Sequence, residues 1–410
     1  MYTTENNAYN GWLKEDFYDL VAKIITFLIS PFLSFIYSLK RMNSKSSFLV
    51  FFLFALFYGM CFSIIADNLD VWESNDAAKY RYRFENTKIY TINDYIDYCK
   101  EYFLFVGADV RDIYFATVTY FVHLFSDNYH VFFMTVACVF SFFQLKSLRY
   151  IIKSSEFDNG IQCFLLCVLF SLNTIAGICA FRFWTAAWIC VYCIFRLYYD
   201  GKRKYLIILL LLPLVHRSFF FFDIILLLSL TCKYEKMWKT LYFFSFLFSG
   251  ISVYIMRDAT QYLPSIFSSM IEGYTEETIY ETYSVTKQFL TSLSTIYVNL
   301  LFLILFWKKN EISSNILGLA RFTLVYLTII NFVFPIPSLG ERFIVLSYSL
   351  VAFLWLNIMG TKNKYNLLIY LMPLFMGRRL YLDFYMLTKY QSVSFFYTNP
   401  IELIYSCIIQ

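Results

Sequence analysis

Charged residues and glycines are scarce in this sequence, and histidine is rarer still. Only 15% of the 410 residues are charged, whereas 59% are hydrophobic, and this balance excludes a soluble globular protein. The 12 glycines argue against a transporter whose helices pack through small residues. The formal net charge of +5 is modest and gives no sign of a nucleic-acid partner.

Cysteine usage gives no sign of a disulfide framework. Almost all of the 10 cysteines lie within apolar runs, where they act as small hydrophobic residues. Cys190 and Cys193 have the spacing of a redox or metal-binding pair. They fall in an expected membrane helix, however, so we expect them to pack there. Cys99 stands alone in its polar loop.

Aromatic residues and long apolar runs dominate what is present. Phe and Tyr number 48 and 36, and such rings suit both membrane spans and the headgroup level. The apolar runs alternate with short loops rich in Lys and Arg, a pattern typical of cytoplasmic loops. We therefore predict an all-α fold, a polytopic integral membrane helical bundle with about 10–11 membrane segments. The expected segments include residues 20–39, 48–66, 129–145, 161–177, 183–199, 205–230, 241–256, 289–306, 323–334, 343–359 and 367–376.

The chain reads as one bundle preceded by a short N-terminal segment. Residues 1–46 hold the first span or an interfacial helix, with Pro31 as the interruption, and residues 47–410 form the membrane domain. Polar outer loops are expected near 67–128 and 257–288. Because the first 19 residues are polar and acidic, we expect no cleavable signal peptide.

Residues 205–230 are apolar and long enough to cross a bilayer, yet they contain His216, Arg217 and Asp223. Ionisable groups are costly in hydrocarbon and normally face a bundle interior or a watery cavity. Pro213 removes an N–H and crowds the preceding turn, so the helix should break there. Basic clusters flank the run on both sides, which predicts a broken, re-entrant helical pair with His216 and Arg217 at its tip. The alternative is one long span.

This topology brings charged residues together on the outer side. They are Arg182, His216, Arg217, Glu341, Arg342, Asp76, Lys79 and Arg81. An excess of cations there runs against the positive-inside bias. An anionic substrate would explain it, because the planar fork of arginine matches phosphate oxygens in pairs.

Simpler interpretations remain open for several of these residues. His216 is also compatible with an interior histidine bonded to a carbonyl freed by Pro213. We favour a structural role for Asp223, paired with Arg217 or a lysine. Arg378 and Arg379 are best explained as side chains that reach the headgroups without a specific ligand.

Several motifs together resemble the EpsG-like polysaccharide polymerases, which belong with the Wzy-type O-antigen and capsule polymerases. Asp76-Ala-Ala-Lys79-Tyr80 resembles the D-x-x-[R/K]-Y signature of their first outer loop. The other elements of the resemblance are Asp112-Ile-Tyr, the Phe-rich span ending in Lys146-Ser147-Leu148, Arg182 opening a helix, His216-x-Ser218, and Arg342 after a Pro/Gly turn. The resemblance extends from about Phe48 to Trp355, and the order of the motifs gives most of its specificity.

The resemblance implies a multi-pass enzyme of the bacterial inner membrane. It would join oligosaccharide repeats carried on undecaprenyl pyrophosphate, at the periplasmic or outer side, and it would work beside a flippase and a chain-length regulator. Arg182, Arg217 and Arg342 would stabilise the charge that develops on the pyrophosphate. His216 would be the base for the acceptor hydroxyl, or Asp76 instead.

The remaining candidates would bind the sugars. Asp76 and Glu341 would orient hydroxyl groups, and Lys79, Tyr80 and Arg81 would add to the substrate-binding surface. The sequence has no His/Cys ligand cluster and no DxD motif in the first outer loop, so we predict a metal-independent reaction without a cofactor.

Two other functions fit the sequence. One is a glycosyltransferase that uses a lipid-phosphate sugar, with Asp67 or Asp70 as base. The other is a flippase for lipid-linked oligosaccharides, which should show paired broken helices in two related halves. Only one broken element is apparent here.

Overall fold

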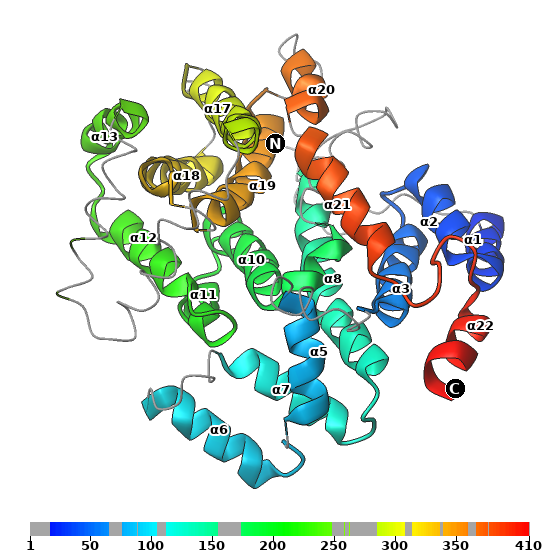
Figure 1. Ribbon diagram of the computed structural model, residues 1–410. Coiled ribbons are helices and arrows are strands. Elements are labelled where there is room, and N and C mark those ends of the chain that lie inside the picture. The colour runs from blue at the N-terminus through cyan, green and yellow to red at the C-terminus, as the bar shows by residue number, and fades with distance from the viewer. Residues whose placement is uncertain are drawn as a thin grey trace, which may run out of the picture.

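The fold is described by a computed structural model, drawn in Figure 1. It describes residues 17–64, 76–87, 89–104, 112–154, 174–247, 258, 262, 285–307, 314–336, 339–359, 366–375 and 377–409. The expected span at 161–177 lies almost entirely outside these residues, as do most of the outer loop at 257–288 and part of the span at 241–256.

The described residues form helices joined by short turns, with one isolated bridge between Phe62 and Gln391. The principal helices are α1 (Phe17–Ile29), α2 (Pro31–Leu39), α3 (Lys45–Cys61), α5 (Asp76–Asn86), α6 (Ile92–Leu104), α7 (Ile113–His123), α8 (Tyr129–Ser154), α10 (Phe181–Ile194), α11 (Tyr205–Leu210), α12 (Phe219–Thr231), α13 (Glu235–Leu247), α17 (Val285–Trp307), α18 (Ser314–Val333), α19 (Leu339–Met359), α20 (Asn366–Phe375), α21 (Gly377–Lys389) and α22 (Pro400–Ile404). The prediction of an all-α fold is therefore confirmed.

Among the described residues, four helical stretches are long and apolar enough to cross a membrane. They are Tyr129–Ile152, Ile175–Tyr199, Ile316–Val333 and Leu339–Met359. Shorter apolar helices accompany them at Lys45–Cys61, Tyr205–Leu214, Phe219–Thr231 and Ser292–Phe306. These apolar helices indicate a multi-pass membrane protein.

Residues 17–39 form a helical hairpin and not one kinked span. Ser30 caps α2 by accepting a hydrogen bond from the N–H of Leu33, and Pro31 occupies the first helical position. The hydroxyl of Tyr37 then reaches back to Asp19 at 2.8 Å, so the two helices run antiparallel. With 13 and 9 residues, neither helix has the length of about 20 residues that a span needs.

The core helices are aligned so that their ends coincide. Phe62, just after α3, meets Phe133 at the start of α8, with ring centroids 4.6 Å apart. Phe183 near the start of α10 meets Phe343 near the start of α19 at 5.3 Å. At the far ends of α10 and α19, Phe195 meets Phe353 at 4.6 Å. We call the end with Phe62, Phe183 and Phe343 the site end, and the other the basic end.

The broken, re-entrant helical pair is confirmed. Residues 211–218, which include a short 3₁₀ turn at Leu212–Leu214, separate α11 from α12. At the basic end, Arg196 lies 5.1 Å from the ring of Tyr205, which opens α11, and Tyr198 is hydrogen-bonded to Ser229 in the last turn of α12. At the site end, the ring of Phe219 lies 5.4 Å from that of Phe183. Helix α11 therefore begins at the basic end, and α12 runs from the site end back to the basic end.

The C-terminal residues, which the sequence left unassigned, return to the N-terminal helices. The backbone N–H of Ser392 donates to the carbonyl of Cys61 at 2.8 Å. Phe395 then packs against Phe32 and Tyr58, with ring centroids 5.9 Å and 5.5 Å away. In Figure 1 the red α22 accordingly lies beside the blue α1–α3.

Candidate functional site

Helices α5, α6 and α7 cover the site end, and they come from the region expected to be the first outer loop. Figure 1 shows them together below α10 and α11. Tyr95 on α6 is hydrogen-bonded to Thr117 on α7 at 3.0 Å. The hydroxyl of Tyr102 on α6 donates to the carbonyl of Pro213 at 3.1 Å, so α6 is attached to the break between α11 and α12. Burial raises the pKa of Tyr102 to about 12, which keeps this donor protonated at neutral pH.

A buried ion pair forms the centre of the site. The Nη1 of Arg182 lies 2.5 Å from Oδ2 of Asp112, and the exposed fractions of these side chains are 10% and 1%. Asp112 also caps α7 by accepting from the N–H of Phe115 at 3.0 Å. The Nε of Arg182 donates to the hydroxyl of Tyr80 at 3.0 Å, and its guanidinium lies 4.8 Å from the Tyr80 ring. Tyr80, in the motif of the expected first outer loop, thereby contacts Arg182 at the start of α10.

Arg217 belongs to the same electrostatic environment. Its charge acts on the carboxyl of Asp112 and on the hydroxyl of Tyr102. Arg217 therefore lies close enough to the Arg182–Asp112 pair to act on it electrostatically, although the two arginines come from different helical elements.

His216 and Arg342 both lie against the ring of Phe183. The imidazole of His216 stands perpendicular to the ring of Phe183 with centroids 5.4 Å apart. The guanidinium carbon of Arg342 lies 5.6 Å from the centre of the same ring. The expected convergence of α10, the re-entrant tip and the start of α19 is therefore present in the fold.

The hydrogen bonds of His216 define its tautomer. Nδ1 lies 2.7 Å from the hydroxyl of Ser218 and 3.3 Å from the Ser218 backbone nitrogen. Because a backbone N–H can only donate, Nδ1 accepts, and the proton of the neutral imidazole resides on Nε2. In this state the hydrogen-bond donor of His216 is Nε2. Tyr102 bonds the carbonyl of Pro213 itself. The alternative interpretation, in which His216 bonds a carbonyl freed in the turn before Pro213, stays a prediction.

The other predicted site residues differ in their surroundings. Arg81 donates to the carbonyl of Ile64 at 2.7 Å and stacks 3.8 Å above the ring of Tyr129, so it attaches α5 to the bundle. Lys79 is exposed. Asp76 is partly buried and acts electrostatically on Tyr80. Glu341 and Arg342 are partly buried in the first turn of α19.

Sequence reasoning gave no role to three residues that the fold places here. As a lone aspartate before an apolar run, Asp112 had the sequence signal of a helix cap. Its ion-pair partner, Arg182, lies 70 residues away in the sequence, so the pairing could not be predicted. Ser218 belonged to the His216-x-Ser218 motif but had no assigned role, and Phe183 gave no signal, because the roles of both depend on which side chains they meet. The expected pairing of Asp223 with Arg217 or a lysine is absent from the described residues, where Oδ1 of Asp223 has no hydrogen-bond partner.

In the described part of the chain, no group of three or more His, Cys, Asp or Glu side chains is placed to hold a metal ion. Metal independence stays a prediction. The side chains of Arg378 and Arg379 lie outside the described residues, so their expected contact with headgroups also stays a prediction.

The chain that forms this site can be compared with known proteins. No curated protein and no solved structure matches the chain. The sequence model of the EpsG family matches residues 63–397, which include α5–α7, the re-entrant pair and the start of α19. Proteins of this family serve in exopolysaccharide biosynthesis. The chain belongs to the EpsG family.

Proposed function

We propose that this protein polymerises oligosaccharide repeats carried on undecaprenyl pyrophosphate, as in the synthesis of an O-antigen, capsule or exopolysaccharide. The observation that carries the proposal is the meeting of Arg182, Arg217, His216 and Arg342 at one end of the bundle. Fixed donors and cations of this kind suit a diphosphate leaving group. The reaction takes place on the outer face of the bacterial inner membrane, within the sugar-assembly apparatus that includes a flippase and a chain-length regulator.

In the proposed reaction, the acceptor sugar hydroxyl attacks the anomeric carbon of the growing chain. The bond between that carbon and the pyrophosphate oxygen breaks, and the lipid pyrophosphate leaves with the electron pair. Arg217 and Arg342 stabilise the new negative charge, while Arg182 is held by Asp112 and orders the site around them. The hydroxyl proton passes to a base.

The hydrogen bonds of His216 favour one assignment of the catalytic roles. With its proton on Nε2, neutral His216 donates to a pyrophosphate oxygen, and Asp76 is then the base. The other possibility is the opposite tautomer, in which His216 takes the proton. Lys79, Tyr80, Arg81 and Glu341 are proposed to shape the sugar-binding surface around these groups.

The product length in cells tests the proposal. We expect His216→Ala and Arg342→Ala to leave the protein inserted while surface glycan stops at a single repeat. Lys100→Ala, on the exposed face of α6, is the matched control and should give the normal ladder. Complete loss of surface glycan would indicate a flippase instead, and normal ladders from both site variants would refute the site.

His216→Gln separates the two roles of the imidazole. A glutamine amide can donate a hydrogen bond but cannot act as a base near neutral pH. We expect His216→Gln to retain measurable polymerisation, with His216→Ala at least about tenfold slower, a difference that corresponds to one lost hydrogen bond to a charged group. Equal inactivity of both variants would assign the base to His216.

The metal requirement is tested separately. Purified protein supplied with lipid-linked repeats should retain its rate in excess EDTA, because arginines stabilise the leaving group in this proposal. Loss of activity that Mg²⁺ or Mn²⁺ restores would contradict the metal-independent mechanism.

A further inference from the structure

A second candidate site lies at the basic end, away from the site cluster. A cavity of about 230 Å³ opens there between α12, α13 and α18. Its lining includes Tyr198, Ser229, Lys233, Trp238, Gly318 and Arg321. Tyr198 follows α10 and Ser229 is near the end of α12, which places this cavity at the far end of the re-entrant pair from His216.

The rim of this cavity carries more positive than negative charge. Glu235 pairs with Lys239 at 2.8 Å and with Arg321 at 3.5 Å. The side chains of Lys239 and Arg321 are 41% and 59% exposed, and Lys233 is also exposed. One carboxylate among three cations leaves a net positive rim that attracts an anion.

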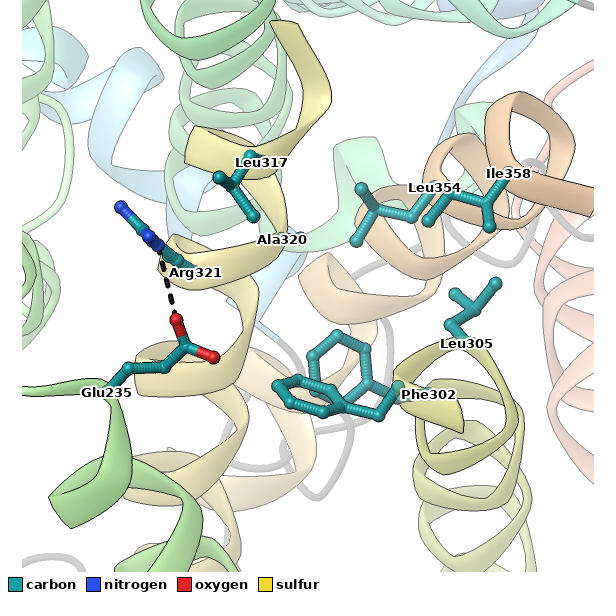
Figure 2. A pocket seen from close by; sticks show the side chains of 9 residues that line it. Glu235, Phe302, Leu305, Leu317, Ala320, Arg321, Leu354 and Ile358 are labelled. Carbon is teal, nitrogen blue, oxygen red and sulfur yellow. Dashed lines mark ion pairs between the residues drawn. The ribbon is translucent and has the colours of Figure 1, made fainter. Parts of the chain in front are cut away.

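An apolar crevice adjoins the charged rim. Figure 2 shows the Arg321–Glu235 pair on one side and Phe302, Leu305, Leu354 and Ile358 on the other. The crevice runs between α17, α18 and α19, and it shares Glu235 and Arg321 with the larger cavity. Charged and apolar surfaces therefore meet at Arg321, as the two parts of an amphiphile require.

We propose that this cavity binds the headgroup of an anionic membrane phospholipid. Lys233 and Arg321 hold the phosphate, and the acyl chains follow the apolar walls of α12 and the crevice beside Phe302. Basic pockets between transmembrane helices at the cytoplasmic boundary are typical sites for such headgroups. By the positive-inside rule, the loop that carries Lys202, Arg203 and Lys204 places the basic end at that boundary.

Several variants isolate the cavity. A Cβ built on Gly318 would meet only Cδ1 of Tyr198, at 3.6 Å, so Gly318→Leu fills the cavity without a backbone clash. Lys233→Ala/Arg321→Ala removes the cations and leaves Glu235 paired with Lys239. Lys236→Ala, at an exposed position in α13 outside the lining, is the matched control. Lys233→Ala alone decides the question if either of the first two fails to fold, because this side chain is exposed.

The test is native mass spectrometry of purified full-length protein released from nanodiscs that contain equal phosphatidylglycerol and phosphatidylcholine. We expect the parent protein to retain phosphatidylglycerol preferentially. Gly318→Leu and Lys233→Ala/Arg321→Ala should each reduce this retention at least about tenfold, and Lys236→Ala should not. Equal retention of both lipids by the parent protein, or unchanged retention in Gly318→Leu, would overturn the proposal.

A competition experiment distinguishes a lipid phosphate from free phosphate in the cavity. Inorganic phosphate and glycerol 3-phosphate are added in turn, at the concentration at which short-chain phosphatidylglycerol displaces the retained lipid. Failure of both to displace it supports a lipid site, since they lack acyl chains. Equal displacement by either would show that the cavity recognises free phosphate and would overturn the lipid assignment.

Discussion

The guanidinium of Arg182 is enclosed by residues from helices that are distant in the sequence. Asp112 provides its counter-charge, and Tyr80 accepts its Nε–H while covering one face. Burial raises the pKa of Tyr80, so its hydroxyl stays neutral beside the arginine. A buried charge of this kind is tolerated only with such partners. The same contacts fix where α5, α7 and α10 meet.

We predict that Asp112→Asn abolishes most polymerisation and destabilises the protein. Asparagine can still cap α7, so the change removes the charge and keeps the cap. Removing one partner of a buried ion pair costs roughly 3–5 kcal/mol. Thermal unfolding in detergent measures the stability, and the product ladder measures the activity.

The double variant Asp112→Asn/Arg182→Gln is the control for this interpretation. Because it removes both charges, it should recover much of the stability lost in Asp112→Asn while remaining inactive. Stability that falls further in the double variant would show that the two charges are not coupled.

At the scale of elements, the first turn of α19 depends on a close approach to the end of α18. A Cβ on Gly340 would lie 2.4 Å from Cα and 2.5 Å from the carbonyl oxygen of Phe334. Both atoms are backbone, so the helices themselves would have to separate. Arg342 is in this turn, which links the glycine to the site.

We predict that Gly340→Ala costs roughly 1–3 kcal/mol through overpacking. It should also impair polymerisation, because the turn that carries Arg342 moves. Gly318→Ala in α18 is the control, since its Cβ would meet only an ordinary contact at 3.6 Å. Thermal unfolding and the product ladder are measured for both, and equal behaviour of the two variants would contradict this account.

Buried amides join α17 to α18 and α13. Asn299 on α17 and Asn331 on α18 exchange side-chain hydrogen bonds of 2.9 Å and 3.0 Å. Tyr242 on α13 donates to the same Asn299 oxygen at 2.7 Å. Interhelical bonds of this type supply association energy in lipid, where apolar side chains gain little by leaving the hydrocarbon.

At the scale of the whole molecule, all proposed site residues share one end, and the basic residues of the described segments 202–204 and 233–239 lie at the other. This arrangement predicts that the site end faces outward. In a Cys99→Ser background, we expect Tyr82→Cys on α5 to react with a membrane-impermeant maleimide in intact cells. Lys236→Cys on α13 should react only after permeabilisation. Both positions are exposed, so access to reagent depends on the side of the membrane. The reverse pattern would place the chemistry on the cytoplasmic face.

The sequence predicted much of this organisation because membrane insertion depends on local composition. Apolar length, basic loops and the interruption at Pro213 were enough to indicate an all-α bundle and the re-entrant pair. The family resemblance was confirmed, although the match runs from residue 63 to 397 instead of starting near Phe48 and ending near Trp355. The hairpin of residues 17–39 was harder to predict, because the reversal of the chain at Ser30 depends on tertiary contacts such as the hydrogen bond of Tyr37 to Asp19.

By itself, then, the sequence determined that the chain lies in a membrane as helices and which charged residues lie near one boundary. Hydrophobicity and charge act on each segment separately, so they can be read along the chain. Only the tertiary structure decided that Asp112 partners Arg182, that Tyr102 holds the carbonyl of Pro213, and that His216 and Arg342 both lie against Phe183. These contacts join helices far apart in the sequence, and they depend on ångström-scale packing that no local pattern specifies.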